Sequence, residues 1–298
     1  MSLKDRGIFK KFLSLRPHQL SHYAFENIYI WKGLFDIKWF VFQDSLCVFF
    51  QDKAGCFLYL APLSGDKNPE VIEKAFQIMD RFNKNKDVSR IENIEEPDTP
   101  FYENLGYTCQ NKSYDYLCPR GELAGLRGNK FKSKRACFNY FTKHYEFRYL
   151  PLSLKHKDNC LELYDSWVKE RKAKNQGRIY QGMMEDSRRP LKNALDNYSD
   201  LNFIGRVVSI DKKIKAFTFG FKLNPDTFCI LYEITDLSIK GLSQFIFSRF
   251  SSELEGYKYI NIMDDSGLEN LQKVKLSYHP AKLIPAYIVK KENSPRLS

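Results

Sequence analysis

The sequence predicts an α+β protein of two successive domains, each with a mixed, mostly antiparallel sheet in a three-layer arrangement with helices. Its 298 residues are enough for two domains of average size. The hydrophobic fraction of 43%, with 24 Phe and 18 Tyr, supplies apolar side chains for two cores. One order of predicted strands and helices also occurs twice along the chain. We therefore expect an N-terminal domain over residues 1–118 and a C-terminal domain over residues 119–298.

The first domain is predicted to begin with a meander of antiparallel strands between Ile37 and Ala61. Aromatic and β-branched residues flank turns at 44–45 and 51–55 in this segment. A helix over residues 69–82 is predicted next, because apolar residues recur at helical spacing, at Val71, Ile72, Ala75, Phe76 and Met79. The remaining elements are a strand near 88–91, a short helix within 101–107 and a strand that runs to Cys118.

The second domain is predicted to start with a basic connector, residues 119–144. Its helix begins at Asn129 and turns four aromatic residues inward, Phe131, Phe138, Phe141 and Tyr145. Hydrophobic patterns then indicate strands at 146–150, 203–209, 214–221, 227–234, 259–263 and 283–289, and helices at 157–174, 183–198, 240–254 and 267–275. Both halves thus contain a meander, a helix, a strand, a short helix and a closing strand, which predicts an internal structural repeat.

Positive charge is concentrated in the connector and the segment after it. Lysine and arginine number 47 against 36 acidic residues, a net charge of +11. Residues 120–178 hold 15 Lys and Arg against six Asp and Glu, which is +9 of that total. Such an excess favours a polyanionic partner, such as nucleic acid or an acidic membrane surface. A basic cluster at the start of the connector helix is predicted to bind phosphate, and it consists of Arg127, Lys130, Lys132, Lys134 and Arg135. A solvated helix face is the alternative explanation.

Several kinds of protein and site are disfavoured. Seven Cys without a CxxC pair and five His without metal-ligand spacing argue against a zinc ribbon, a disulfide framework and any metal site. No apolar run approaches the roughly 18 residues of a membrane span, and no signal-peptide pattern follows the basic N-terminal segment. Hydrolase, zincin, P-loop and dinucleotide motifs are missing. We expect a cytoplasmic protein, with peripheral contact with an acidic membrane as an alternative.

The end of the strand predicted at 227–234 offers a catalytic carboxylate. Aromatic neighbours favour a raised pKa for Glu233, so Glu233 and Tyr232 are assigned to catalysis, with Glu233 as the general base for an attacking amine or hydroxyl. An ion pair with a lysine is the structural alternative. The following turn passes Asp236, assigned to the acceptor. It then reaches a helix start with a predicted phosphate site at Lys240, Gly241 and Ser243.

A second strand end brings acidic and basic residues together. Asp264 and Asp265 follow the strand predicted at 259–263, where they are assigned to the acceptor, and helix capping or metal binding is the alternative. Tyr278 is assigned to proton transfer. Lys273, Lys275 and His279 are predicted to hold a phosphate or carboxyl group, and a turn at His279-Pro280 is the competing role for that histidine.

Four segments carry a family resemblance. Residues 101–107 (FYENLGY) are similar to the closing helix-to-strand signature of the acetyltransferase-like (GNAT) fold. Residues 23–31 (YAFENIYIW), 126–135 (LRGNKFKSKR) and 261–280, with DDSG at 264–267 and KLSYHP at 275–280, together carry a more specific likeness. They resemble the family of unknown-function proteins similar to the C-terminal domain of phosphatidylglycerol lysyltransferase. The resemblance spans nearly the whole chain and implies two tandem GNAT-like domains.

The resemblance implies a transferase that moves an aminoacyl group from a charged tRNA to an amine or hydroxyl acceptor, a lipid or another molecule. The coenzyme A loop of ordinary acetyltransferases reads Arg or Gln, two residues, Gly, one residue, Gly or Ala. Residues 238–243 (SIKGLS) keep one Gly and lack the leading Arg or Gln, so aminoacyl-tRNA is preferred to acetyl-CoA as donor. The alternatives are a non-catalytic binder of RNA or acidic membranes on the same fold, and an acetyl-CoA-dependent N-acetyltransferase.

Overall fold

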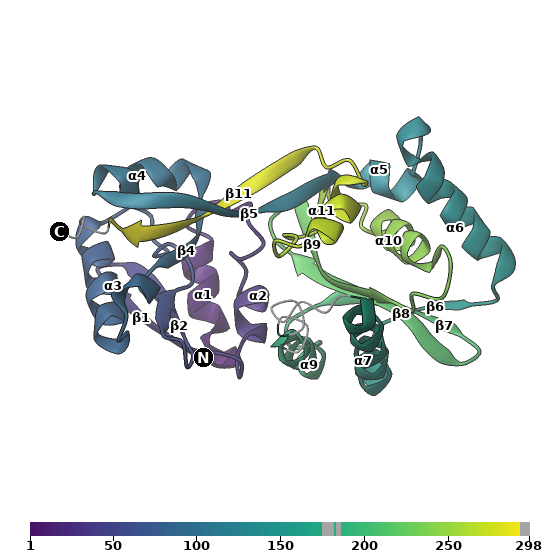
Figure 1. Cartoon of the computed structure of the whole chain (residues 1–298), viewed down its shortest axis with the longest axis horizontal. Helices are drawn as coiled ribbons and strands as arrows, with labels where there is room; N and C mark the ends of the chain where they lie inside the picture. The colour runs from purple at the N-terminus through teal and green to yellow at the C-terminus, as the bar shows by residue number, and fades with distance from the viewer. Residues whose placement is uncertain (175–181, 183–185, 293–298) are drawn as a thin grey trace. The chain divides into compact units, whose positions relative to one another are not determined.

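The chain forms two compact α+β units (Figure 1). The computed structural model describes residues 1–174, 182 and 186–292. Unit 1 comprises Met1–Asp115, Asp264–Gly267 and the chain from Ile284 onward, and unit 2 comprises Tyr116–Met263 and Leu268–Leu283. The boundary predicted after residue 118 and the boundary between the units both lie within strand β5 (Tyr107–Pro119). Unit 1 also includes Asp264–Gly267 and the chain from Ile284 onward, which lie outside the predicted domain of residues 1–118.

The sheet of unit 1 is a meander extended by a parallel strand. Its strands are β1 (Asp36–Phe42), β2 (Ser45–Gln51), β3 (Cys56–Leu58), β4 (Ile91–Glu95), β11 (Lys282–Lys291) and β5. They lie side by side in the order β1-β2-β3-β4-β11-β5. The pairs β1-β2 and β2-β3 are antiparallel, as the sequence predicted, β3 is parallel to β4, and β11 is antiparallel to β4.

Strand β4 lies further along the chain than predicted. Residues Lys86–Val88 form a 3₁₀ turn, and the strand begins at Ile91. Three of its five residues are polar and yet buried, namely Glu92, Asn93 and Glu95. Hydrogen bonds replace the water that these side chains lose, with Lys112 bound to Glu92 and His18 to Glu95. A strand of this kind shows no apolar pattern, which explains the misplaced prediction.

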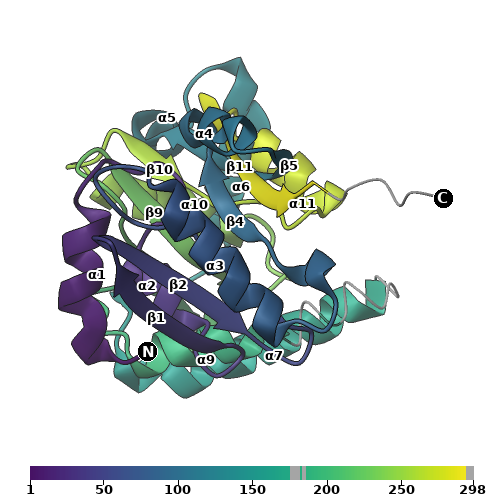
Figure 2. The same ribbon diagram turned by 90° about the vertical axis from the view of Figure 1, so that its left-hand side faces the viewer.

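Four helices complete unit 1: α1 (Arg6–Leu13), α2 (Phe25–Ile30), α3 (Pro69–Phe82) and α4 (Thr99–Asn104). Helix α3 buries all five apolar residues predicted for its inner face and packs against β3. Figure 2 shows α3 lying across the sheet of unit 1. The basic N-terminal segment packs on its own unit through α1, because Phe9 and Phe12 are buried and Arg6 pairs with Glu26 at 2.5 Å.

The sheet of unit 2 runs in the order β5-β10-β9-β8-β7-β6. Its strands, besides β5, are β6 (Arg148–Pro151), β7 (Ile204–Ile210), β8 (Lys213–Lys222), β9 (Thr227–Thr235) and β10 (Tyr259–Asn261). Only β9 and β10 pair in parallel; the other neighbours are antiparallel. The register of β8 and β9 shifts between Phe219 and Gly220, which places a bulge at Leu231, two residues before Glu233.

Helices cover both faces of this sheet. They are α5 (Arg120–Gly125), α6 (Lys132–His144), α7 (Lys157–Lys174), α9 (Arg188–Asp196), α10 (Leu242–Glu253) and α11 (Glu269–Leu276). Helix α10 packs on one face of β8 and β9, and α7 on the opposite face (Figure 1). Apolar side chains of α10 and α6, among them Phe245 and Phe141, meet Ala216 of β8 and form a core with them.

Several predicted boundaries in unit 2 shift. Helix α5 was not predicted, because the glycines at 121 and 125 indicated a loop. The connector helix begins at Lys132 after a 3₁₀ turn over Asn129–Phe131, so Asn129 does not cap it. Its aromatic residues do face inward, with Phe131 and Phe141 fully buried. The helix predicted at 183–198 is described as α9, and residues 183–185 lie outside the described part.

The predicted repeat is visible in the order of elements. Unit 1 contains β1-β2-β3-α3-β4-α4-β5, and the second half of the chain contains β7-β8-β9-α10-β10-α11-β11. Each series places a parallel pair of strands around a helix, β3 and β4 around α3, and β9 and β10 around α10. Among the described residues, no helix combines the length and the apolar character needed to cross a membrane.

Candidate active site

The side chains of β9 alternate between the two faces of the sheet, and this separates Glu233 from Tyr232. The Tyr232 hydroxyl donates to the carbonyl of Ser187, the N-cap of α9, at 3.5 Å. Glu233 points to the other face, toward α6 and α10, and lies opposite Thr218 of β8. The two residues assigned together to catalysis therefore occupy different environments.

Glu233 has an enclosed carboxyl group. Its Oε2 atom is buried and has no hydrogen-bond partner among the described residues, although the residue as a whole keeps some exposed surface. Burial raises the pKa of Glu233 from its usual 4.5 to about 8, and the positive charge of Lys134 offsets part of that rise. A carboxyl group that titrates near neutral pH can both accept and return a proton, as general acid-base catalysis requires.

Lys134 and Tyr278 lie beside this carboxyl group. The ammonium of Lys134, on α6, is 4.3 Å from the centroid of the Tyr278 ring. Burial lowers the pKa of Lys134, and Glu233 opposes that shift. Tyr278 is 6% exposed, its hydroxyl is hydrogen-bonded to Gln244 of α10, and burial raises its pKa. We call Glu233, Lys134, Tyr278 and Gln244 the Glu233 cluster.

The Glu233 cluster combines predicted and unpredicted residues. The sequence predicted Glu233, Tyr278 and Lys134, although Lys134 was expected to face a phosphate from the surface. Gln244 was missed, and so was Thr218, which is fully buried with an Oγ1 atom that has no hydrogen-bond partner in the described part of the chain. The helix 242–253 also contains Ser243, Ser248, Arg249, Ser251, Ser252 and Glu253, so no sequence signal distinguished Gln244.

The start of α10 is shaped by a close backbone approach. Gly241 is the N-cap residue with φ +85°, and a Cβ atom there would lie 2.1 Å from the carbonyl oxygen of Cys137 in α6. Lys240 is exposed and its ammonium lies 4.5 Å from the centroid of the Tyr140 ring, while Ser243 is half-buried. Lys240 is therefore available to a phosphate, whereas Gly241 is required for packing.

Asp236 is occupied by structural contacts. Its Oδ2 lies 2.8 Å from the Lys215 ammonium, and its Oδ1 accepts hydrogen bonds from the backbone and hydroxyl of Ser238. Burial would raise the pKa of Asp236, but these hydrogen bonds outweigh it and lower the pKa. This carboxylate stabilises the turn before α10.

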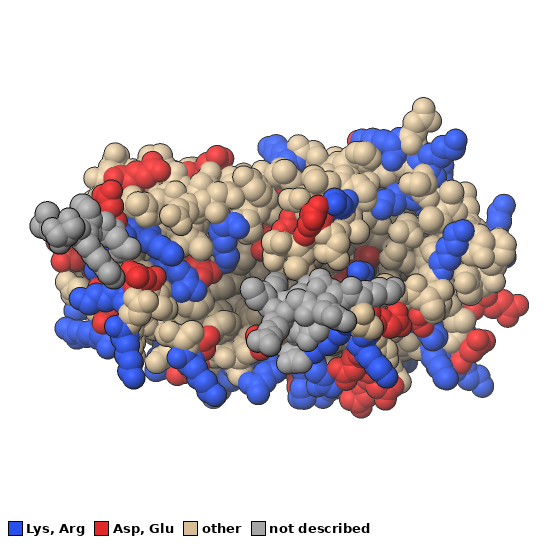
Figure 3. All heavy atoms as spheres, viewed as in Figure 1, with Lys and Arg blue, Asp and Glu red and all other residues tan. Residues whose placement is uncertain are grey.

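The five basic residues of the connector do not form one surface. Arg135 donates to the carbonyls of Leu126 and Gly128, and Lys134 points into the Glu233 cluster. Arg127, Lys130 and Lys132 are exposed, with Lys130 in an ion pair with Glu122 at 2.5 Å. Figure 3 shows lysine and arginine side chains gathered over α6. A polyanion would meet the three exposed residues.

The basic residues predicted around α11 also divide. The Lys275 ammonium donates to the carbonyls of Ile262 and Met263 at 2.5 and 3.1 Å. Lys273 is exposed and pairs with Glu269 one turn earlier. The Nε2 atom of His279 lies 3.3 Å from the carbonyl oxygen of Lys130. Lys275 and His279 therefore bind backbone carbonyl groups of the chain itself. Lys273 lies at the surface.

The acidic pair at 264–265 belongs to unit 1, whereas Asp236 belongs to unit 2. Asp265 is 7% exposed, and its Oδ1 accepts a hydrogen bond from the backbone of Gly267 at 2.9 Å. The helix that follows has Leu268 as its N-cap, so Asp265 closes a turn and caps no helix. Among the described residues, no group of three or more His, Cys, Asp or Glu side chains could hold a metal ion.

The sequence profile of the family described as phosphatidylglycerol lysyltransferase, C-terminal, matches residues 14–290 of the chain. The chain belongs to this family. No curated protein matches the sequence. A conserved protein of unknown function from Bacteroides thetaiotaomicron is 27% identical, with a TM-score of 0.85 over 98% of both chains.

Two further solved structures connect this lysyltransferase family with the GNAT fold. L-PGS from Bacillus licheniformis is 16% identical, with a TM-score of 0.66 over 98% of this chain and 93% of that one. A tandem GNAT protein from the clavulanic acid biosynthesis pathway is 9% identical, with a TM-score of 0.51 over 99% of this chain and 98% of that one. The fold is thus the tandem GNAT-like fold that the resemblance implied, and family and fold together support a transferase.

Proposed function

We propose that the chain is an aminoacyltransferase that moves an aminoacyl group from a charged tRNA to an amine or hydroxyl acceptor, with Glu233 as the general base. The observation that carries this proposal is the enclosed Glu233 carboxyl group, whose pKa of about 8 suits proton transfer near neutral pH. Family membership supports the reaction type, because the family is described as a phosphatidylglycerol lysyltransferase family.

The proposed reaction is an acyl transfer with a balanced proton count. The ionised carboxylate of Glu233 takes the proton from the acceptor nitrogen or oxygen, which attacks the ester carbonyl carbon of the aminoacyl-tRNA. The tetrahedral intermediate collapses, the bond from that carbon to the tRNA ribose oxygen breaks, and the protonated Glu233 returns its proton to this oxygen. Lys134 holds a positive charge beside the carboxylate and stabilises its ionised form.

The tRNA backbone would lie on exposed basic residues of unit 2. Arg127, Lys130 and Lys132 are exposed at the start of α6, and Lys240 is exposed at the start of α10. Phosphate contacts of this kind give affinity that falls with salt concentration. Neutralising Arg127 and Lys132 together should lower the affinity for tRNA and reduce its salt dependence by about two released counterions. Unchanged binding and unchanged salt dependence would contradict this role.

A transfer assay tests the reaction. The purified chain is incubated with lysyl-tRNA carrying labelled lysine and with vesicles containing phosphatidylglycerol, and in parallel with labelled acetyl-CoA and amine acceptors. We expect aminoacyl transfer, with E233Q at least about 100-fold slower and its tRNA affinity unchanged. Transfer from acetyl-CoA alone would replace the proposed donor. Binding of tRNA or vesicles without any transfer would identify a non-catalytic binder.

A further inference from the structure

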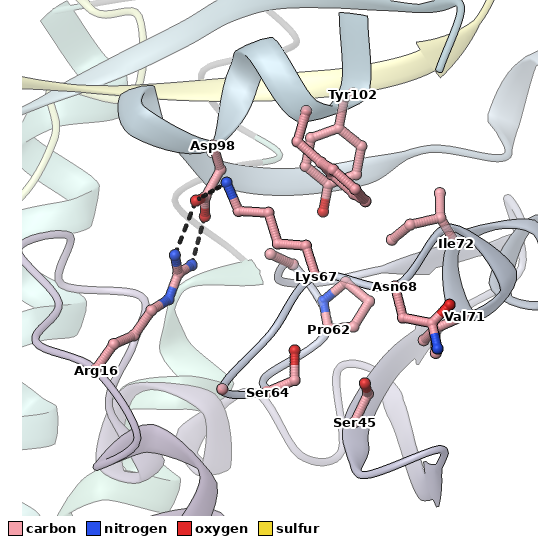
Figure 4. A pocket seen from close by; sticks show the side chains of 13 residues that line it. Arg16, Ser45, Pro62, Ser64, Lys67, Asn68, Val71, Ile72, Asp98 and Tyr102 are labelled. Carbon is pink, nitrogen blue, oxygen red and sulfur yellow. Dashed lines mark hydrogen bonds and ion pairs between the residues drawn. The ribbon is translucent and has the colours of Figure 1, made fainter. Parts of the chain in front are cut away.

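Unit 1 contains a polar pocket at the start of helix α3, separate from the Glu233 cluster of unit 2 (Figure 4). Its lining includes Arg16, Ser64, Lys67, Asn68, Asp98 and Tyr102. The cavity volume is about 40 Å³, the space of about three water molecules. The pocket thus has room for one small polar group, such as a carboxylate or a phosphate.

The charged side chains that line this pocket are Arg16, Lys67 and Asp98. Asp98 is 2% exposed, and its carboxylate receives two hydrogen bonds from the Arg16 guanidinium and lies 2.8 Å from the Lys67 ammonium. Burial would raise the pKa of Asp98, but the hydrogen bonds from Arg16 and Lys67 outweigh it and lower the pKa. Asp98 therefore stays ionised at neutral pH. A second carboxylate, that of Glu95, lies 3.9 Å from the Arg16 guanidinium, so Lys67 is the cation of the pocket that can still attract an anion.

The hydroxyl of Tyr102 points into the same space. Tyr102 is 2% exposed and lines the pocket, and Figure 4 shows its hydroxyl directed toward the interior. This hydroxyl makes no hydrogen bond to any described residue. Burial and the nearby Asp98 raise the pKa of Tyr102 well above its usual value, so the hydroxyl keeps its proton and can donate it. The hydroxyl can therefore donate a hydrogen bond to a group bound in the pocket.

The first turn of α3 adds to the positive potential. The helix has 14 residues, starts with Pro69, and is capped by Asn68, whose Oδ1 accepts a hydrogen bond from the backbone of Glu70 at 2.9 Å. Val71 and Ile72 of the same turn line the pocket. Pro69 has no N–H group and the Glu70 amide is bound to Asn68, so this turn attracts anions through the helix dipole rather than through free amide groups.

From this arrangement we propose that unit 1 carries a binding site for a small anionic group, a carboxylate or a phosphate monoester. The Tyr102 hydroxyl and the remaining N–H groups of the Lys67 ammonium donate to it, the start of α3 faces it, and Asp98 competes with it for Lys67. The site lies in a different unit from the proposed general base, so either proposal can be wrong without affecting the other.

Calorimetric titration of the full chain with sodium phosphate, and separately with sodium acetate, tests the site at constant ionic strength. We expect saturable binding with a dissociation constant on the order of 1 mM. K67M should weaken it at least about 5-fold and Y102F about 3-fold, since each removes a donor. The matched controls K53M and Y59F, outside the pocket in the same unit, should bind like the native chain.

Tighter binding of phosphate than of acetate would assign a phosphate monoester, and the reverse order would assign a carboxylate. Absence of saturable binding for both anions would overturn the proposal, as would unchanged affinity in K67M and Y102F. D98N provides a further test, because loss of the competing carboxylate should tighten phosphate binding several-fold in the folded variant. Equal or weaker binding by folded D98N would also overturn the proposal.

Discussion

The two units share an order of elements but hold their key carboxyl groups in opposite ways. In unit 2, Glu233 lies within strand β9, has an Oε2 atom without a partner in the described structure, and has a pKa raised to about 8. In unit 1, the strand at the same point of the repeat, β3, holds only buried Cys56, Phe57 and Leu58. The buried Asp98 of this unit lies after β4 and is bound by two cations.

This comparison shows that the surroundings of a carboxyl group, and not the fold, decide what it can do. Asp98 is fixed in its ionised form by Arg16 and Lys67, so it stabilises unit 1 and cannot exchange protons near neutral pH. Glu233 faces a single partly buried lysine and remains able to change its protonation state. The same fold therefore holds one carboxyl group that stays ionised and another that can titrate near neutral pH.

The largest expected effect on stability comes from D98N. Removal of the charge leaves Lys67 without its carboxylate and Arg16 with only the more distant Glu95, and we expect a loss on the order of 3 kcal/mol in the free energy of unfolding at pH 7. Because the folded-state pKa of Asp98 is below its unfolded value of 3.8, its contribution is present above about pH 4 and is lost as pH falls further. Urea unfolding at pH 7 and pH 3 measures this, and an equal loss at both pH values would contradict it.

Substitution of the glycines before α3 and α10 compares the two helix starts. G241A places a Cβ atom 2.1 Å from the Cys137 carbonyl oxygen at a φ of +85°, whereas a Cβ atom at Gly65 meets nothing within 4 Å. We expect G241A to lose roughly 2 to 3 kcal/mol of unfolding free energy and G65A to change it by less than about 0.5 kcal/mol. Thermal unfolding of both variants tests the difference, which equal melting temperatures would exclude.

E233Q should affect stability with the opposite dependence on pH. The folded-state pKa of about 8 exceeds the unfolded value of 4.5, so the folded state binds this proton more tightly. The native chain is then most stable below about pH 4.5 and loses stability as pH rises to about 8. We expect E233Q to gain on the order of 1 to 2 kcal/mol relative to the native chain between pH 5 and pH 9. Chemical unfolding of E233Q and of the native chain measures the difference in their unfolding free energies across this pH range. A difference that does not change with pH would contradict the raised pKa.

The smallest expected effect is a change in the transfer rate on substitution of Lys134. Lys134 lowers the pKa of Glu233, so K134M should move the rise of transfer rate with pH to higher pH and reduce the rate at pH 7 about 3-fold. K143M is the matched control, because Lys143 is an exposed lysine on the same helix with no role in the proposed site. The transfer rates of both variants are measured from pH 6 to pH 10. A K134M profile that coincides with the K143M profile would show that Lys134 does not act on Glu233.

Most helices and strands, and some residues of the candidate site, could be predicted from the sequence alone. Regular apolar spacing located α3, α7 and the strands of both meanders to within a few residues, because burial of one face imposes that spacing. It failed at β4, where buried polar residues are satisfied by partners distant in sequence, and at α5, where two glycines lie in a helix.

Glu233 could be singled out because a carboxylate among aromatic strand residues is unusual. Its partners could not be ranked, since five basic residues of the connector looked alike in sequence. Only the packing of α6 on the sheet turns Lys134 inward and leaves Lys132 exposed. The pocket of unit 1 was not predicted, because Arg16, Lys67 and Asp98 are separated by dozens of residues.

The position of β11 also determines when unit 1 can be completed during protein synthesis. This strand lies between β4 and β5, yet its residues are made after the whole of unit 2. A ribosome that has translated the first 119 residues has made β4 and β5 without the strand that pairs between them. Unit 1 lacks this strand for more than half of the synthesis of the chain, so its sheet can be completed only after unit 2 has been made.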